Sequence, residues 1–390
     1  MASENVDPDR RVLLRNGGLA LGSLLLPACA ATRTAGGTRS CLAPVDVAQD
    51  RVIRTAVGLR PFRASGFVVR EERGEGTRIV HNYGHGGAGI TLSWGSSKLA
   101  VQAGLQGHQG PVAVLGAGVM GLTTARLVQE AGFPVTLYAA ALPPDTTSNV
   151  AGGQFFPASH FRPKAVTSEW HDQYLAALDY SWRRFQIMVG DDYGIRWLPT
   201  YYEAGHGAEP ALLPTFPPNN RLLAAGEHPF PLDQVARYDT LYVETGRFLR
   251  RLMTDIRIGG GRFVVRSFTT PQEVVALPER LVFNCTGLGA RGLFGDMELR
   301  PARGQLAILL PQPEVDYAFT GSAGYMFPRA DGIVLGGTFD LDDWSTEPDP
   351  ATTRRIVQSH RSLFGGLQCR PGSGPVRIRT AGAAAAPPPA

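Results

Sequence analysis

Three glycines between residues 111 and 121 have the spacing of a phosphate-binding turn. Gly116, Gly118 and Gly121 follow the G-x-G-x-x-G pattern, directly after an apolar run and before a helical pattern over residues 122–130. In such a turn the first glycine allows the sharp change of direction, the second lets the backbone approach a pyrophosphate, and the third lets the helix pack closely on the strand. The pattern indicates a dinucleotide site. Its position is unusual, because more than a hundred residues precede it.

Short polar side chains follow the second expected strand, residues 134–138. Thr147 and Ser148 are candidates to contact phosphate, with helix capping as the alternative, and Gly152 lies in a further glycine-bearing turn. Ala140 stands where an acid usually binds the ribose 2′-hydroxyl. Residues 281–287 have the pattern of a buried strand that ends in a polar turn, which suggests a second loop facing the nucleotide.

A second glycine-rich stretch, HNYGHGGAGIT, covers residues 81–91. Its composition is poor for a strand and for a helix, so we expect a loop that offers backbone N–H groups to a ligand. A helix is expected to follow over residues 97–103. His81 and His85 suggest a metal site, but no third ligand is nearby, so we favour packing or hydrogen-bonding roles and expect no bound metal.

Composition indicates a globular protein with one large core or two moderate ones. The 390 residues are 43% hydrophobic and 18% charged, and the formal net charge is +4 with acids and bases interspersed. This pattern has no basic stripe of the kind that binds nucleic acid. The 47 glycines and 30 prolines are typical of an α/β enzyme with long connections. The sequence indicates no particular oligomeric state.

The first thirty residues are expected to be a targeting signal. Arg10 and Arg11 precede two leucines and a short, weakly hydrophobic segment, residues 17–27, which is typical of twin-arginine export. That segment is too short to span a bilayer. Cys29 ends a lipoprotein-like processing box and is a candidate lipid anchor, with plain signal cleavage as the rival and a basic amphipathic helix as the simplest alternative. The expected location is the periplasm or the cell envelope.

The four cysteines show no metal-ligand spacing. Cys285 lies in an apolar run and is expected to be buried. Cys41 and Cys369 are candidates for a disulfide in an oxidising compartment.

Seven motifs together resemble the D-amino-acid oxidase family of FAD flavoproteins. They are GLRPFR (58–63), HNYGHGGAGIT (81–91), GAGVMG (116–121), NCTG (284–287), RGQ (303–305), YMFP (325–328) and LGGTF with a later Trp (335–344). In that family the first two motifs close the chain, whereas here they precede the nucleotide strand. We therefore expect a circular permutation, since a six-residue linker such as residues 105–110 can reach about 20 Å.

The resemblance implies an α/β fold, with a Rossmann-like FAD-binding domain and a second, mainly antiparallel sheet in a substrate domain. The expected division is residues 1–40 as export signal and tether, 41–158 and 238–292 as a discontinuous FAD-binding domain, 159–237 and 293–365 as the substrate domain, and 366–390 as a tail.

The resemblance also implies roles for single residues toward the substrate. The Arg60 guanidinium would pair bidentately with the substrate carboxylate, and the Tyr325 hydroxyl would donate to the same group. The backbone of Gly87 would accept from the substrate amino group. A second active-site tyrosine of the family is replaced by Gly321, so we expect a more open pocket.

The remaining residues of the implied site would hold the cofactor. The polar edge of the flavin ring is assigned to Gly86, Gly87, Gly89, Ile90 and Thr91, the pyrophosphate to Gly116, Gly118, Gly121, Thr147 and Ser148 with Gly152 beside them, and the adenine side to the backbone of Phe268.

The implied activity is the FAD-dependent oxidative deamination of a D-amino acid. A hydride leaves the α-carbon for the flavin, O2 reoxidises the flavin to give H2O2, and the imino acid hydrolyses. One alternative is a glycine or imino-acid oxidase, or a dehydrogenase, of the same superfamily with another electron acceptor. A second alternative is a non-catalytic flavin-binding lipoprotein, but intact Arg60 and Tyr325 argue against it. A third is a nicotinamide-dependent reductase, but the sequence lacks a second nicotinamide-type motif.

Overall fold

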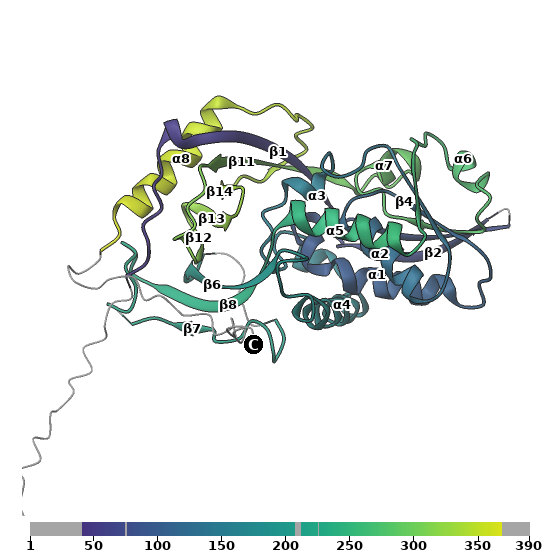
Figure 1. The fold of residues 1–390 in the computed structure, drawn as a ribbon, viewed down its shortest axis with the longest axis horizontal. Coiled ribbons are helices and arrows are strands. Elements are labelled where there is room, and N and C mark those ends of the chain that lie inside the picture. Colours follow the sequence, from purple (N-terminus) through teal and green to yellow (C-terminus); the bar gives the residue numbers. More distant parts are fainter. Residues whose placement is uncertain (1–40, 75, 207–211, 225, 369–390) are drawn as a thin grey trace, which may run out of the picture. The chain divides into compact units, whose positions relative to one another are not determined.

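The computed structural model describes residues 41–368 except 75, 207–211 and 225. Within this part of the chain two sheets carry the fold, and helices pack on both (Figure 1). The predicted export signal and tether, the candidate anchor Cys29, Cys369 and residues 369–390 of the predicted tail lie outside the described residues. None of the described helices is long and apolar enough to cross a membrane.

The first sheet is mixed, with five parallel strands and one antiparallel edge strand. In spatial order it contains β2 (Val68–Gly74), β3 (Thr77–Tyr83), β10 (Leu281–Asn284), β4 (Val112–Leu115), β5 (Val135–Ala139) and β9 (Arg262–Val265), of which β2 is antiparallel. The inner strands β10, β4 and β5 are buried along their whole length. Helices cover both faces of a sheet of this kind, which explains the continuous apolar runs of its strands.

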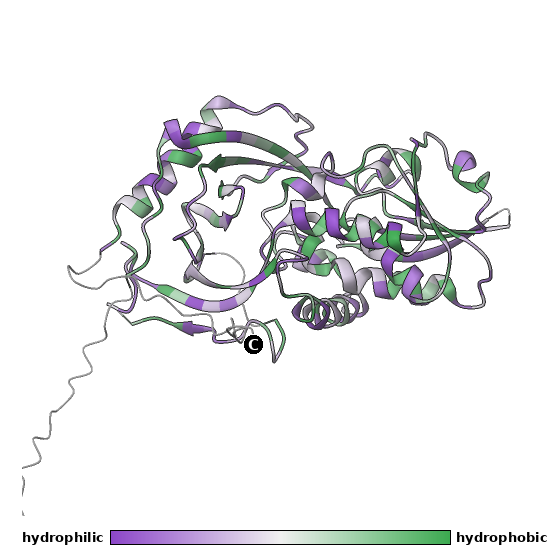
Figure 2. Ribbon diagram, in the orientation of Figure 1, coloured by the Kyte–Doolittle hydropathy of each residue, from purple (hydrophilic) through white to green (hydrophobic). Residues whose placement is uncertain are grey.

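Four long helices form the core on one face of this sheet. They are α1 (Gly89–Leu105), α2 (Val119–Glu130), α4 (Ser168–Gln186) and α5 (Thr245–Ile258). The Thr167 side chain caps α4 by accepting from Trp170 N at 3.2 Å. Figure 2 shows hydrophobic and hydrophilic residues on the same helices, as expected when one stripe faces the core. On the opposite face lie the short helices α6 (Pro271–Val275) and α7 (Gly289–Leu293).

The second sheet has nine strands and is antiparallel except where β12 meets β6. In spatial order it contains β1 (Val52–Phe62), β11 (Arg300–Leu309), β14 (Gly332–Gly336), β13 (Gly324–Arg329), β12 (Ala318–Gly321), β6 (Ile195–Glu203), β8 (Val235–Val243) and β7 (Arg221–Leu222), and β15 (Asp340–Leu341) also pairs with β11. Helix α8 (Pro350–Gly365) packs on one face of this sheet.

The predicted α/β fold with a mainly antiparallel second sheet is confirmed. The division into a cofactor domain and a substrate domain stays a prediction. Cys285 is buried and has a free thiol, as expected. Cys41 is disulfide-bonded, but the predicted partner lies outside the described residues.

The expectation of a loop over residues 81–91 is wrong at both ends. Residues 81–83 complete β3, and α1 begins at Gly89 rather than near residue 97. Tertiary packing explains the difference, because α1 lies so close to α4 that a Cβ on Gly95 would be 1.8 Å from the carbonyl oxygen of Ala177. Small residues are required at this crossing, although they lower helix propensity.

Candidate active site

A cavity of about 970 Å³ lies between the two sheets and collects most of the predicted site. The predicted residues that line it are Arg60, Gly86, Gly87, Gly89, Ile90, Gly116, Gly118, Thr147, Ser148, Gly152, Phe268 and Tyr325. Segments from distant parts of the sequence therefore meet at one site. Gly121 and Thr91 do not line the cavity.

The glycine turn joins β4 to α2 and forms one wall of the cavity. Gly116 has φ +101°, and a Cβ there would be 2.4 Å from the carbonyl oxygen of Cys285. A Cβ on Gly118 would meet only the Ser148 hydroxyl, at 3.2 Å. The bare backbone of Gly118 therefore leaves room for a ligand beside it.

Gly121 and Thr91 were assigned to the cofactor but have packing roles, and for Gly121 this is the packing role expected of the third glycine. A Cβ on Gly121 would be 1.8 Å from the carbonyl oxygen of Gly116, so glycine here lets α2 press against the turn. Thr91 is buried, and its hydroxyl donates to the Phe156 carbonyl and accepts from the Phe156 N–H, both at 3.1 Å. This pair of bonds fixes the segment that lines the cavity next to α1.

The N-terminus of α2 faces Ser148. The Val119 N–H, the first of the helix, donates to the Ser148 hydroxyl at 3.0 Å. That hydroxyl donates to no group in the described part of the chain, so its proton remains available to a ligand. Thr147 begins the short helix α3 (Thr147–Val150) and is exposed at the cavity wall. Helix N-terminus, hydroxyls and glycine backbone together suit a phosphate group.

The far end of the cavity is lined by Ala140, Arg266 and Phe268. The Arg266 guanidinium carbon lies 4.6 Å from the centre of the Phe268 ring. Sequence reasoning did not single out Arg266, which stands at the end of β9 and lines the same wall as Ala140. A basic side chain thus lies near the place where an acid was expected.

The loop before α1 forms the opposite wall of the cavity. Here η2 (Gly86–Ala88) packs on residues 158–160, because Gly87 N donates to the Ser159 carbonyl at 3.1 Å. A Cβ on Gly87 would be 2.6 Å from the Ala158 carbonyl oxygen. Gly86 has φ +51°, a conformation that L side chains rarely adopt.

His81 and His85 have packing and hydrogen-bonding roles. His81 Nε2 lies 3.1 Å from a Glu72 carboxylate oxygen and its Nδ1 lies 2.9 Å from the Asn284 amide nitrogen. His85 Nε2 lies 2.8 Å from the Ser96 hydroxyl, and its ring stacks on Phe67. Burial lowers the pKa of His85 to about 3. Among the described residues no group of three His, Cys, Asp or Glu side chains is placed to hold a metal ion.

Arg60 lies on β1 with its guanidinium in the cavity. Its Nη2 donates to the Thr338 carbonyl at 2.5 Å, and its guanidinium carbon lies 5.3 Å from the centre of the Phe339 ring. A Cβ on Gly304 would be 2.0 Å from Nη2, so the guanidinium rests directly on the backbone of β11. It forms no ion pair with a described residue, and its other N–H groups remain available for an anion.

Tyr325 lies on β13, and its hydroxyl makes no hydrogen bond with any described residue. Its ring stacks on Phe327 and lies against Gly336, where a Cβ would be 2.4 Å from the hydroxyl oxygen. Burial raises the pKa of Tyr325, and the positive charge of Arg60 partly offsets this effect. The hydroxyl is therefore protonated at neutral pH and able to donate.

Gly321 lines the cavity, but the direction of a side chain at this position does not support the expectation that its absence opens the pocket. A Cβ on Gly321 would be 2.8 Å from the Glu203 carboxylate and 3.0 Å from the Phe319 ring, neither of which lines the cavity. A side chain at this position would thus point to the other face of the sheet, since alternate residues of a strand face opposite sides. Other residues form the walls of the open space beside Tyr325.

Tyr202, Tyr238 and Gln154 form those walls and were missed by sequence reasoning. The two tyrosine rings lie 5.4 Å apart on the paired strands β6 and β8, and the Gln154 amide donates to the Tyr238 hydroxyl at 3.3 Å. Only the register of β6 against β8 brings these residues together, and sequence alone does not reveal it. Thr338 and Phe339 were also missed as site residues, although they lie in the quoted LGGTF motif.

The cavity fits a flavin dinucleotide. It is continuous from Phe268, past the glycine turn and the N-terminus of α2, to Gly87, Arg60 and Tyr325. Glycine backbone lines it where added Cβ atoms would reduce its volume, and hydroxyls and a helix N-terminus stand where phosphates need donors. The fold and the site together define a dinucleotide-binding oxidoreductase.

The chain belongs to the family of FAD-dependent oxidoreductases called DAO. The family model matches residues 32–103 and 111–387. The cofactor is FAD, and the predictions of this cofactor and of a flavin oxidoreductase are confirmed.

Several characterised proteins are similar to this chain. A D-amino-acid oxidase of Streptomyces coelicolor is 34% identical over 267 residues, which cover 66% of this chain and 78% of that protein. A D-amino acid oxidase of Dugesia ryukyuensis is 28% identical over 268 residues, with the same coverage. Human D-aspartate oxidase is 28% identical over 270 residues, 63% of this chain and 73% of that protein. Among solved structures, a glycine oxidase of Bacillus cereus matches with a TM-score of 0.48 and 14% identity over 65% of this chain and 78% of that one.

Proposed function

We propose that this protein oxidises a D-amino acid to the corresponding imino acid, which hydrolyses in water. The observation that carries the proposal is the position of Arg60 and Tyr325. A guanidinium without an acidic partner and a protonated hydroxyl stand in the cavity that holds the cofactor. These two donors match a substrate carboxylate. The names of the relatives supply the D-configuration and the amino-acid class.

The residues of the chain act mainly by positioning. Arg60 and Tyr325 fix the substrate carboxylate, and the backbone of Gly87 accepts from the neutral amino group. The α-hydrogen leaves with its electron pair, and the nitrogen lone pair forms the C=N bond. When bound, FAD would accept this hydride, and O2 would take up the two electrons and two protons to form H2O2. The hydroxyls of Thr147 and Ser148, with Gly116 and Gly118, would hold the diphosphate of the cofactor.

An anaerobic reduction experiment tests the proposal. The purified flavoprotein is mixed with a panel of D-amino acids, L-amino acids, glycine and sarcosine, and the absorbance of the flavin band at about 450 nm is followed. We expect D-amino acids to bleach the band. Oxygen should then restore the band, and H2O2 should form. Bleaching by glycine or sarcosine alone would replace the D-amino-acid assignment with the glycine or imino-acid alternative. No bleaching by any of them would leave a flavin-binding protein without this activity.

We further propose that the chain is a circular permutation of the family order. Two facts support this: β1 and β3, which come early in the chain, pair with the late strands β11 and β10, and the family model matches the chain in two separate segments. A reordered chain that begins at Pro111 and carries residues 41–106 after residue 368 tests it. We expect the reordered protein to bind FAD, and an insoluble or flavin-free product would count against the proposal.

The proposed location is the periplasm or the cell envelope, reached by twin-arginine export and with Cys29 as lipid anchor. Support comes from the sequence pattern of residues 10–29. Replacing Arg10 and Arg11 by lysine is expected to keep the protein in the cytoplasm. Cys29→Ser is expected to release exported protein from the membrane fraction, and unchanged fractionation of this variant would exclude the anchor.

A further inference from the structure

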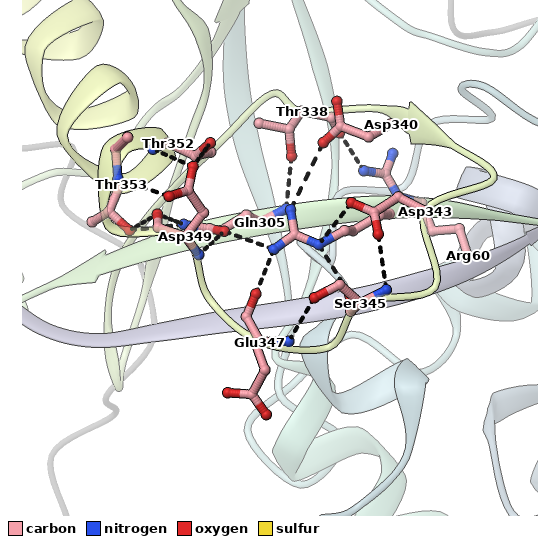
Figure 3. Close-up of polar contacts among 12 residues, drawn as sticks. Arg60, Gln305, Thr338, Asp340, Asp343, Ser345, Glu347, Asp349, Thr352 and Thr353 are labelled. Carbon is pink, nitrogen blue, oxygen red and sulfur yellow. Dashed lines mark hydrogen bonds and ion pairs between the residues drawn. The ribbon is translucent and has the colours of Figure 1, made fainter.

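A loop between β14 and α8, residues 337–349, crosses the edge of the cavity beside Arg60. We call it the β14–α8 loop. Its first residues, Thr338 and Phe339, are the ones that contact the Arg60 guanidinium. Figure 3 shows Thr338 and Asp340 of this loop on one side of β11 and Ser345 on the other, with Asp343 between them and Arg60 beside Asp340 and Asp343. What fixes the loop therefore also fixes Arg60.

The buried guanidinium of Arg303 holds the middle of this loop. Arg303 is only 4% exposed. Its Nε donates to the Ser345 carbonyl at 3.0 Å and its Nη2 to the Glu347 carbonyl at 2.6 Å. The carboxylates of Asp343 and Asp340 lie 3.6 and 3.8 Å from the same guanidinium. Since a buried charge is unfavourable unless it is paired, the loop and Arg303 stabilise each other.

Gln305, two residues further along β11, fixes both ends of the loop. Its backbone N–H donates to the Thr338 hydroxyl at 2.7 Å. Its side-chain amide donates to the Asp349 carbonyl at 2.7 Å and accepts from the Asp349 N–H at 2.8 Å. Asp349 in turn caps α8, because its carboxylate accepts from the first N–H groups of that helix. Arg303 Nη2 also donates to the Gln305 side-chain oxygen at 3.0 Å, so the contacts form one network.

Arg60 receives its orientation from this network. Three groups contact its guanidinium: the backbone at Gly304, which lies between Arg303 and Gln305, the Thr338 carbonyl, and the Phe339 ring. Two of the three belong to the β14–α8 loop. If the loop shifts, Arg60 loses the carbonyl acceptor and the ring, and a long side chain with several rotamers becomes free to leave the cavity.

We propose that Arg303 is a positioning residue for substrate recognition, which acts through the β14–α8 loop to hold Arg60 in place for the substrate carboxylate. The inference rests on the proposed function, because it takes Arg60 as the carboxylate-binding residue. Arg303 itself does not line the cavity and does not touch the substrate.

The test is the variant Arg303→Met, which keeps the length of the side chain and removes its charge and donors. We expect KM for amino acids to rise by about tenfold or more, with kcat at saturation and the FAD dissociation constant little changed. The second readout is binding without turnover: titration of the flavin spectrum with propanoate, a carboxylate that has no amino group. The dissociation constant of propanoate should rise by a similar factor, whereas binding of neutral propanamide should not change.

Arg329→Met is the matched control. Arg329 lies in the same sheet, its side chain is 6% exposed, and it pairs with Asp331 at 2.6 Å, but it does not line the cavity. The Arg329→Met variant should lower the unfolding temperature without raising KM or the dissociation constant of propanoate. Equal effects of the two variants on KM, or no effect of Arg303→Met on propanoate, would overturn the inference.

A milder variant covers the case in which Arg303→Met does not fold. Asp340→Asn combined with Asp343→Asn removes two partly exposed charges from the loop and leaves its backbone contacts in place. We expect a rise of about threefold in KM and in the dissociation constant of propanoate, and wild-type values would contradict the inference.

Arg60→Ala separates the role of Arg303 from the proposed function. If Arg60→Ala loses propanoate binding but the Arg303 and loop variants do not, only this inference fails; if Arg60→Ala binds propanoate as the wild type does, the proposed function fails with it.

Discussion

Arg60 is a partly buried guanidinium with no acidic partner in the described part of the chain. Such a charge is usually paired, so its unpaired donors indicate an anionic ligand. Tyr325 adds a protonated hydroxyl that has no hydrogen-bond partner among the described residues. At the scale of the residue, the proposed substrate recognition therefore depends on two side chains that keep hydrogen-bond donors free of partners among the described residues.

Arg60→Ala is predicted to raise KM for amino acids by about a hundredfold, because two charge-assisted hydrogen bonds to the carboxylate are lost. The flavin content should stay near that of the wild type, since no assigned cofactor contact involves this side chain. Steady-state kinetics and the ratio of flavin to protein measure the two effects. Arg60→Lys should recover only part of the loss, because an ammonium group does not reproduce the bidentate geometry. Loss of flavin in parallel with activity would mean that Arg60 has another role.

Tyr325→Phe is predicted to raise KM by about three- to tenfold, less than Arg60→Ala, because one neutral donor is lost and the ring remains packed on Phe327. The same kinetic assay measures it. A fall in kcat with unchanged KM would point instead to a part in the chemical step.

The glycine turn and helix α2 form the element that we propose holds the cofactor, and its glycines are not equivalent. Gly118 faces the cavity, whereas Gly121 faces the backbone of Gly116. The motif predicts this division, and the structure agrees with it: Gly118 leaves space for a ligand, and Gly121 allows close packing.

Gly118→Ala is predicted to weaken FAD binding while the unfolding temperature of the apoprotein stays close to that of the wild type. A Cβ here meets only the movable Ser148 hydroxyl within the protein, but it fills space beside the ligand. Fluorescence titration with FAD and thermal unfolding of the apoprotein check the two parts. Equal FAD affinity in the variant would contradict the placement of the diphosphate.

Gly121→Ala is predicted to destabilise the protein by about 2 kcal/mol or more, because the new Cβ would clash with a backbone oxygen 1.8 Å away. The matched control is Gly365→Ala in α8, where a Cβ meets nothing within 4 Å and the helix gains propensity. Chemical unfolding of both variants gives the comparison. If Gly121→Ala were as stable as the control, the close approach of α2 to the turn would be wrong.

At the scale of the whole molecule, buried histidines make stability depend on pH. Burial lowers the pKa of His85 and of His160 to about 3 each. In the unfolded chain these histidines are protonated below about pH 6.5, whereas in the folded protein they stay neutral until about pH 3. The free energy of unfolding therefore falls as the pH decreases from about 6.5 toward 3. Each histidine contributes a slope of about 1.4 kcal/mol per pH unit.

His160→Phe is predicted to reduce this slope. The imidazole lies among Phe161, Trp170 and Tyr174, and its Nε2 has no hydrogen-bond partner in the part of the chain that the structure describes. Urea unfolding at pH 7 and at about pH 5 measures the change. The exposed His171→Gln serves as control and should behave as the wild type. An unchanged slope in His160→Phe would show that other groups dominate acid unfolding.

Much of this architecture follows from local patterns. The strand, glycine turn and helix at residues 112–130 are visible in the sequence, because burial and period decide them. The start of α1 was not predictable, since contact with α4 rather than propensity selects its glycines. Tyr202, Tyr238 and the direction of Gly321 depend on strand register, which local sequence does not encode.

The most direct test of the account is the stereochemistry of anaerobic flavin reduction by the two enantiomers of one amino acid. If the backbone of Gly87 and the pair Arg60 and Tyr325 hold the amino group and the carboxylate as proposed, only the D-enantiomer directs its α-hydrogen toward the cofactor. Rapid mixing should show fast bleaching of the flavin band with the D-enantiomer and none with the L-enantiomer. Equal rates with both, or bleaching by the L-enantiomer alone, would contradict the proposed function.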